Sequence, residues 1–125
     1  MIKINQLAIF MDEANSLLME LYNHIIVSTN RVFKVVENED DIQSMYREPL
    51  QWTDKQWHHL AYYKEISDIM RNYRQVVLFG PIDTRKELYK LLEADHHFKN
   101  IEIDFFDTHK MTDLQIHDFA LDYYK

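Results

Sequence analysis

The sequence predicts an α/β fold in which helices cover a sheet, and three patterns support this prediction. Val76–Phe79 is a continuous apolar run, which suits a strand that is buried on both faces. In Ile101–Phe105, apolar residues alternate with acidic ones, as in a half-buried strand. Leu88, Leu91 and Leu92 lie between them at helical spacing. Strand, helix and strand form a βαβ unit, so we expect two parallel strands joined by a right-handed crossover.

The turn after the first of these strands contains Gly80, the only glycine of the chain, followed by Pro81, one of two prolines. Glycine tolerates conformations and close approaches that strain other residues, and proline suits a turn or a first helical position. Asp83 or Thr84 is expected to cap the helix that follows. We therefore expect Gln75–Lys86 to organise the chain.

The N-terminal part of the sequence predicts a three-stranded antiparallel meander. We expect strands at Leu7–Met11 and Ser16–Tyr22, and a third extended segment from Ile25 to Val36. Asp12–Asn15 and Asn23–His24 contain residue types that favour turns. After the meander the elements follow the order α-β-α-β-α, in three layers.

Two capping boxes mark the starts of two further helices. Thr53–Gln56 opens a long helix that ends at about Asn72, and Thr112–Gln115 opens the last helix. Apolar residues recur at helical spacing in both. The stripe of the long helix comprises Trp57, Leu60, Ala61, Tyr62 or Tyr63, Ile66, Ile69, Met70 and Tyr73, and that of the last helix comprises Ile116, Phe119, Ala120 and Tyr123.

The composition fits a single domain spanning residues 1–125, with no cysteine and a formal net charge of −7. The lack of cysteine excludes disulfides, thiol nucleophiles and Cys-ligated zinc. No segment predicts a signal peptide or a membrane span, so we expect a cytoplasmic protein without a membrane partner. The acidic charge argues against tight binding to nucleic acid, which depends on Lys and Arg neutralising phosphates.

Val76–Leu88, which contains the strand, Gly80, Pro81 and the start of the helix, resembles the signature of a known protein family. The family comprises bacterial relatives of the middle domain of archaeal and eukaryotic peptide-chain release factors and Pelota, including host-attachment and translational-machinery proteins. Leu7–Asp12, with the strand after Ala14, is similar to the family's N-terminal hairpin. The order of elements extends the resemblance to most of the chain. It implies a ribonuclease-H-like fold and a role in the translation machinery.

The release-factor middle domain carries a Gly-Gly-Gln loop that promotes peptidyl-tRNA hydrolysis and precedes the long helix. The corresponding region here, Glu48–Thr53, contains Gln51 but neither glycine. Without the glycines the backbone does not present the glutamine in the same way. We therefore interpret Gln51 as an ordinary residue of an irregular, mobile segment, Ile42–Gln51, and expect a non-catalytic protein.

Three carboxylates raise a second hypothesis, a metal-dependent nuclease or hydrolase of ribonuclease-H-like fold. Asp12 follows the first strand, and Glu20 or Asp104 would be its partners. Such a site requires several acids that converge on hard metal ions. The alternative is that Asp12 is a turn residue. The sequence leaves open whether the three side chains converge.

Other polar segments predict no metal site and no cofactor. Adjacent histidines, as in His58–His59 and His96–His97, do not share one helical face. His109 and His117 lack the i,i+4 spacing of helical metal ligands. Glu37–Asp41 contains no glycine, so it predicts a solvated acidic loop rather than a calcium loop.

The turn at Gly80–Pro81 also predicts a weak anion- or RNA-binding face. The following helix offers free N–H groups and the positive end of its dipole beside the carboxyl end of a strand. Arg85 and Lys86 add positive charge, and Arg71 and Arg74 flank the same strand. With one glycine, the turn lacks the dinucleotide and P-loop fingerprints. The alternative is that this turn only lets the helix pack against the sheet.

The sequence is compatible with three functions. The resemblance favours a non-catalytic protein that binds the ribosome or a translation factor. The second function is the metal-dependent nuclease or hydrolase. The third is a self-associating module, which would form a homo-oligomer.

Overall fold

The computed structural model describes residues 5–12, 15–33, 54–81 and 85–125, with the backbone alone at 54–60, 85–87 and 97. In these residues the elements are β1 (Gln6–Met11), β2 (Asn15–Tyr22), β3 (Ile25–Phe33), α2 (Asp54–Met70), β4 (Gln75–Gly80), α3 (Arg85–Glu93), the 3-10 helix η2 (His96–Phe98), β5 (Glu102–Asp107) and α4 (Asp113–Tyr123). No helix in these ranges is long and apolar enough to span a membrane.

The strands form one mixed sheet in the order β3-β2-β1-β4-β5. β1, β2 and β3 pair antiparallel as a meander, and β4 and β5 pair parallel, which confirms both sequence predictions. Sequence analysis left open how the meander joins the βαβ unit. In the structure β1 pairs parallel with β4, so that Phe10 lies opposite Phe79. β1 and β4 are therefore central strands, which explains why both are almost entirely apolar.

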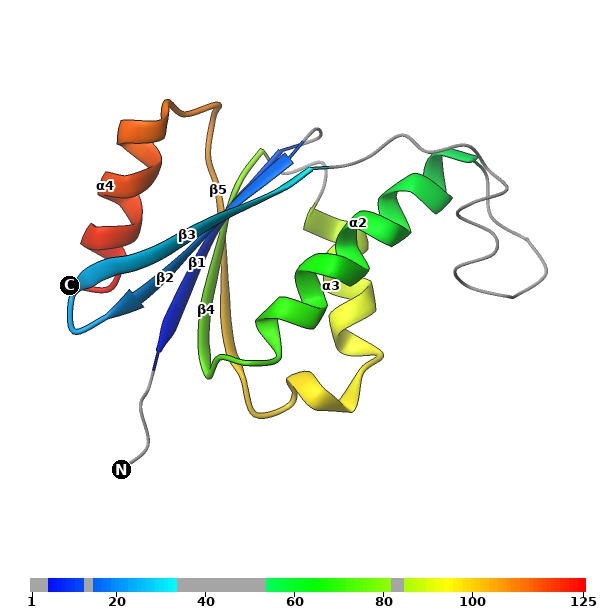
Figure 1. Ribbon diagram of the computed structural model, residues 1–125. Coiled ribbons are helices and arrows are strands. Elements are labelled where there is room, and N and C mark those ends of the chain that lie inside the picture. Colours follow the sequence, from blue (N-terminus) through cyan, green and yellow to red (C-terminus); the bar gives the residue numbers. More distant parts are fainter. Residues whose placement is uncertain (1–4, 13–14, 34–53, 82–84) are drawn as a thin grey trace.

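Helices cover both faces of the sheet (Figure 1): α2 and α3 lie on one face, and α4 lies on the other. Successive residues of a strand point to opposite faces. Leu7, Ile9 and Met11 belong to the core cluster beneath α2 and α3, whereas Ala8 and Phe10 belong to the cluster beneath α4. The fold is the expected ribonuclease-H-like α/β fold in three layers.

The βαβ unit follows the sequence pattern closely. Val76–Phe79 is fully buried in β4, and Leu88 and Leu92 are buried on α3. On β5, Ile103 and Phe105 pack against the core cluster beneath α2 and α3, while the neighbouring Glu102 and Asp104 are exposed. β5 is therefore half-buried, as expected for a strand at the edge of the sheet.

α2 and α4 direct the described parts of the expected stripes toward the core, where some residues are buried and Ile69, Tyr73, Phe119 and Tyr123 are partly buried. The buried residues are Tyr62, Tyr63, Ile66 and Met70 on α2, and Ile116 and Ala120 on α4. The capping box of α4 is confirmed, because Thr112 Oγ1 accepts a hydrogen bond from the Gln115 N–H and Gln115 Oε1 accepts one from the Thr112 N–H. The box at Thr53–Gln56 and the side chains of Trp57 and Leu60 lie outside the described part of the chain.

A two-residue turn joins β2 to β3. Its residues, Asn23 and His24, have positive φ values of 52° and 67°, as the tightest hairpin turns require. Nδ1 of His24 lies 3.1 Å from the carbonyl oxygen of Tyr124. This contact ties the β2–β3 hairpin to the end of α4.

Candidate functional site at the carboxyl edge of the sheet

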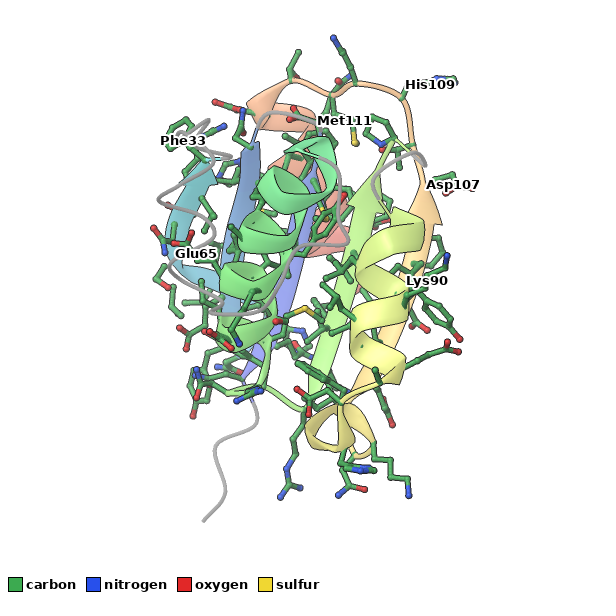
Figure 2. All side chains as sticks on the ribbon, turned by 90° about the vertical axis from the view of Figure 1, so that its right-hand side faces the viewer. Phe33, Glu65, Lys90, Asp107, His109 and Met111 are labelled. Carbon is green, nitrogen blue, oxygen red and sulfur yellow. The ribbon has the colours of Figure 1, made fainter. Side chains whose placement is uncertain are left out.

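The parallel strands β1, β4 and β5 end at the same edge of the sheet (Figure 1). Ligands of open α/β sheets bind outside this edge, where the carboxyl ends of strands meet the starts of helices. The edge comprises Met11–Asp12, Gly80–Pro81 and Asp107–Thr108. Figure 2 shows Asp107 and His109 at this end of the molecule.

Gly80 ends β4 in a conformation that requires glycine. Its φ is 141°, and a Cβ atom at this position would overlap the carbonyl oxygen of Met11. On the other side, the carbonyl oxygen of Gly80 accepts a 2.9 Å hydrogen bond from the N–H of Thr108. Gly80 therefore lets the ends of β1 and β5 close against β4 from both sides. The prediction that Gly80 fills a strained or crowded position is confirmed.

Asp12 shapes the turn between β1 and β2. Its Oδ1 accepts a 2.8 Å hydrogen bond from the N–H of Asn15, and its own N–H donates to the Asn15 carbonyl oxygen at 3.0 Å. A side chain that bonds the backbone a few residues ahead is typical of turn aspartates. The interpretation of Asp12 as a turn residue is confirmed.

A buried polar pair lies behind this turn. Ser16 is fully buried, and its hydroxyl bonds to the hydroxyl of Tyr62 on α2. Because the Tyr62 hydroxyl donates to the Asp12 carbonyl oxygen at 3.3 Å, Ser16 is the donor in the first bond. Burial raises the pKa of Tyr62, and the Asp12 carboxylate adds to the increase. Ser16 therefore bonds a neutral phenol rather than a base, an arrangement that suits a structural role and not nucleophilic catalysis.

The hollow at this edge is small and apolar. Its volume is about 10 Å³, which is room for about one water molecule. It is lined by Met11, Leu78, Phe79, Gly80, Pro81, Leu88, Phe105 and Phe106. Small-molecule sites usually enclose about 300–1,000 Å³. A ligand at this edge would therefore contact its outer surface and not enter the hollow.

The structure divides the predicted binding residues between two ends of β4. Gly80–Pro81 lies at the carboxyl end, and α3 begins just beyond it with Arg85–Lys86, for which the backbone alone is described. Arg71 and Arg74 lie at the opposite end, between α2 and β4. A six-residue strand separates its two ends by about 20 Å. Arg71 is also paired with Asp95 at 2.9 Å. The candidate binding residues therefore form two groups, one at each end of β4.

The three acids of the nuclease hypothesis do not converge. Asp12 lies beyond the carboxyl end of β1, whereas Glu20 lies near its other end and accepts a 3.2 Å hydrogen bond from Tyr73. Asp104 lies within β5 and accepts a hydrogen bond from Tyr123 on α4. Across the described ranges, no group of three or more His, Asp or Glu residues is placed to hold a metal ion. This geometry contradicts a metal site shared by these acids.

Several sequence predictions fall outside the described part of the chain. They concern residues 34–36 of the third strand, Glu37–Asp41, Ile42–Gln51 with Gln51 itself, the cap at Asp83 or Thr84, and the side chains of His58, His59 and His97. Among the described histidines, His96 and His109 are exposed. Nδ1 of His117 lies 2.6 Å from the carbonyl oxygen of Asp113, which is a local contact within α4.

An open groove of about 240 Å³, which the sequence did not predict, lies beside α3, η2 and β5. It is lined by Tyr89, Leu92, Glu93, Asp95, Phe98, Lys99, Ile101, Ile103 and Phe105. Tyr89 packs edge-on against Phe105, with ring centroids 5.6 Å apart. The alternating pattern of β5 predicted that one side of the strand is apolar. It did not predict that α3 leaves part of that side open.

No family model and no curated protein matches this sequence. Among solved structures, the chain is similar to the Pelota protein of Thermoplasma acidophilum, with 13% identity and a TM-score of 0.57 over 94% of this chain and 32% of that chain. The PPX-GPPA enzyme of Aquifex aeolicus gives 10% identity and a TM-score of 0.36 over 85% of this chain and 36% of that chain, which is too weak a likeness to carry an argument.

The Pelota likeness concerns the fold, because only 13% of the aligned residues are identical. This chain spans about a third of the length of the Pelota protein, of which it covers 32%. The matched part includes nearly all of the strands and helices described above. The chain has a Pelota-like fold.

Proposed function

We propose that this protein is a non-catalytic binding protein of the translation machinery, with the ribosome or a translation factor as its partner. The observation that carries the proposal is the Pelota-like fold, which extends over 94% of the chain. It agrees with the resemblance of Leu7–Asp12 and Val76–Leu88 to the release-factor middle domain. Because one fold hosts many functions, the proposal depends on the fold and these two segments together.

Three observations support binding rather than catalysis. Asp12, Glu20 and Asp104 lie apart, so they do not share a metal ion. The buried hydroxyl of Ser16 bonds to the neutral Tyr62 and not to a general base. The hollow at the carboxyl edge, about 10 Å³ in volume, does not enclose a substrate.

The proposed contact lies at the carboxyl edge, on Gly80–Pro81 and Arg85–Lys86. The start of a helix favours anions through its free N–H groups and its dipole, and two basic residues follow the turn here. Arg71 and Arg74, at the other end of β4, form a separate second candidate. The net charge of −7 means that any contact with RNA is confined to one such small patch.

Co-sedimentation with purified ribosomes at low salt tests this proposal. Wild type is compared with the double variants Arg85→Ala/Lys86→Ala and Arg71→Ala/Arg74→Ala, and with the control Lys64→Ala/Lys125→Ala. Each variant removes two positive charges, so all three have the same net charge. Lys64 and Lys125 are exposed, so their replacement should not disturb the core.

We expect wild type and the control to sediment with ribosomes, and the Arg85/Lys86 variant to remain largely in the supernatant. If only the Arg71/Arg74 variant fails to sediment, the ribosome is still the partner, but the contact lies at the other end of β4. Failure of the wild type to sediment would reject the ribosome as the partner.

A further inference from the structure

β3 forms one edge of the sheet and, apart from a register shift near its start, lacks the usual features of a protected edge. Of the described strands, only β2 pairs with it. β3 has nine residues, and Arg31 is its only charged residue. Ile25, Val27 and Phe33 are 59%, 48% and 59% exposed. A long, apolar edge strand with little charge is a template for pairing with another strand.

The opposite edge, β5, carries the protection that β3 lacks. Glu102, Asp104 and Asp107 make half of its six residues acidic. Charged side chains on an edge strand oppose the addition of further strands. Figure 2 shows the two sides, with Phe33 on one and Asp107 on the other. The two edges thus differ in chemistry, and β3 is the one suited to pairing.

We propose that two copies of this chain pair antiparallel through β3, about a twofold axis at Asn30, and join their sheets into one. This inference does not depend on the proposed function. The register of β3 against β2 shifts at Val27, between Ile26 and Ser28. Residues from Ser28 to Phe33 pair regularly with β2 and offer a regular edge to a second strand, and Val27, at the shift, lies at the outer end of the proposed pairing.

The sequence of β3 is complementary to itself in this register. The opposed residues are Val27 with Phe33, Ser28 with Val32, Thr29 with Arg31, and Asn30 with its own copy. The twofold axis generates the Val27–Phe33 contact twice, and each contact joins two side chains that are exposed in the single chain. An axis at Arg31 would instead place two like charges directly opposite each other, which is destabilising.

Charge also favours β3 as the place where two copies meet. With a net charge of −7, two copies repel each other over most of their surface. β3 contains no acid, and the guanidinium of Arg31 bonds to Asn15 at 2.8 Å and to Asp113 at 3.5 Å within its own chain. Pairing through β3 therefore brings no acidic residue of one strand opposite an acidic residue of the other.

Sedimentation equilibrium of the full chain over a concentration series tests this inference. Two double variants, Val27→Lys/Phe33→Lys and Val27→Glu/Phe33→Glu, each place like charges opposite each other in a homodimer. A mixture of the two places Lys opposite Glu at both ends of the pairing. The control Tyr89→Lys/Leu114→Lys changes two other exposed residues.

We expect a dimer for wild type and for the control. Each β3 variant alone should dimerise at least tenfold more weakly, and their equimolar mixture should regain the dimer. Circular dichroism checks that the variants are folded, and Asn30→Lys, which places two lysines on the axis, is a second route to the monomer. A monomeric wild type, dimeric β3 variants, or a mixture that stays monomeric would each overturn the inference.

Discussion

A Cβ atom on Gly80 would overlap the carbonyl oxygen of Met11 and lie 3.1 Å from its carbonyl carbon. This close approach follows directly after the pairing of Phe10 with Phe79, where the two central strands end. The φ of Gly80, 141°, is one that residues with side chains rarely adopt. The only glycine of the chain therefore allows the ends of β1 and β4 to approach each other closely at the carboxyl edge of the sheet.

We expect Gly80→Ala to lower the free energy of unfolding by more than about 1 kcal/mol, because the added methyl group meets both backbone strain and the Met11 carbonyl. Urea denaturation of the purified variant measures the change. Pro81→Ala, at the adjacent half-buried residue, is the control and should cost less. An unchanged midpoint for Gly80→Ala would show that the close approach is dispensable.

The Ser16–Tyr62 pair should couple β2 to α2. Ser16→Ala leaves the buried Tyr62 hydroxyl without its donor, which we expect to cost about 1–3 kcal/mol of stability. Tyr62→Phe removes the same bond and the one to Asp12. The double variant should therefore lose less stability than the sum of the two single variants. Strict additivity in a double-mutant cycle would contradict this coupling.

Two partly buried tyrosines, Tyr73 and Tyr123, should add to the loss of stability that the buried Tyr62 causes at alkaline pH. Burial, followed by the Glu20 carboxylate, raises the pKa of Tyr73 from 10.0 to about 12. Burial, followed by the Asp104 carboxylate, raises the pKa of Tyr123 from 10.0 to about 12. A pKa that is higher in the folded state contributes stability that is complete below pH 10 and is lost as the pH rises toward 12.

Denaturation at pH 9, 10 and 11 measures this dependence. We expect the free energy of unfolding to fall less steeply between pH 9 and pH 11 for Tyr73→Phe and for Tyr123→Phe than for wild type. The two effects should add, because the residues bond to acids on different strands. If the free energy of unfolding falls equally steeply with pH in wild type and in the double variant, Tyr73 and Tyr123 do not cause the alkaline loss.

The capping box of α4 gives a prediction about local stability. Thr112→Ala removes the acceptor of the Gln115 N–H, so we expect a loss of about 1 kcal/mol. Thr112→Ser keeps a hydroxyl in the same place and should retain most of the stability. Equal midpoints for the Ala and Ser variants in thermal or urea denaturation would show that the cap contributes little.

The sequence predicted those parts of the fold that depend on local pattern. The apolar run at Val76–Phe79, the alternation at Ile101–Phe105 and the box at Thr112–Gln115 each occupy a few consecutive residues and determine one element. Gly80 was identified because a chain with one glycine places it where other residues would be strained. These signals need no knowledge of distant contacts.

The candidate site was predicted less well, because it depends on packing between distant segments. The pairing of β1 with β4 puts Asp12 and Gly80 at one edge. Arg71 and Arg74 precede β4, so they lie at its amino end, away from Gly80. In the sequence Ser16 is an ordinary strand residue. Its buried hydroxyl bonds to Tyr62, which follows 46 residues later in the chain. Periodicity within one segment carries no information about such contacts.

Binding to ribosomes is measured most directly by co-sedimentation of the wild-type chain over a series of salt concentrations. We expect sedimentation at low salt that weakens as salt rises, because phosphate contacts release counterions. A contact of Arg85 and Lys86 with two phosphates should give a shallow slope of roughly −1.4 to −1.8 in log K against log salt, from about 0.7–0.9 per phosphate. No sedimentation at the lowest salt would contradict the ribosome as the partner.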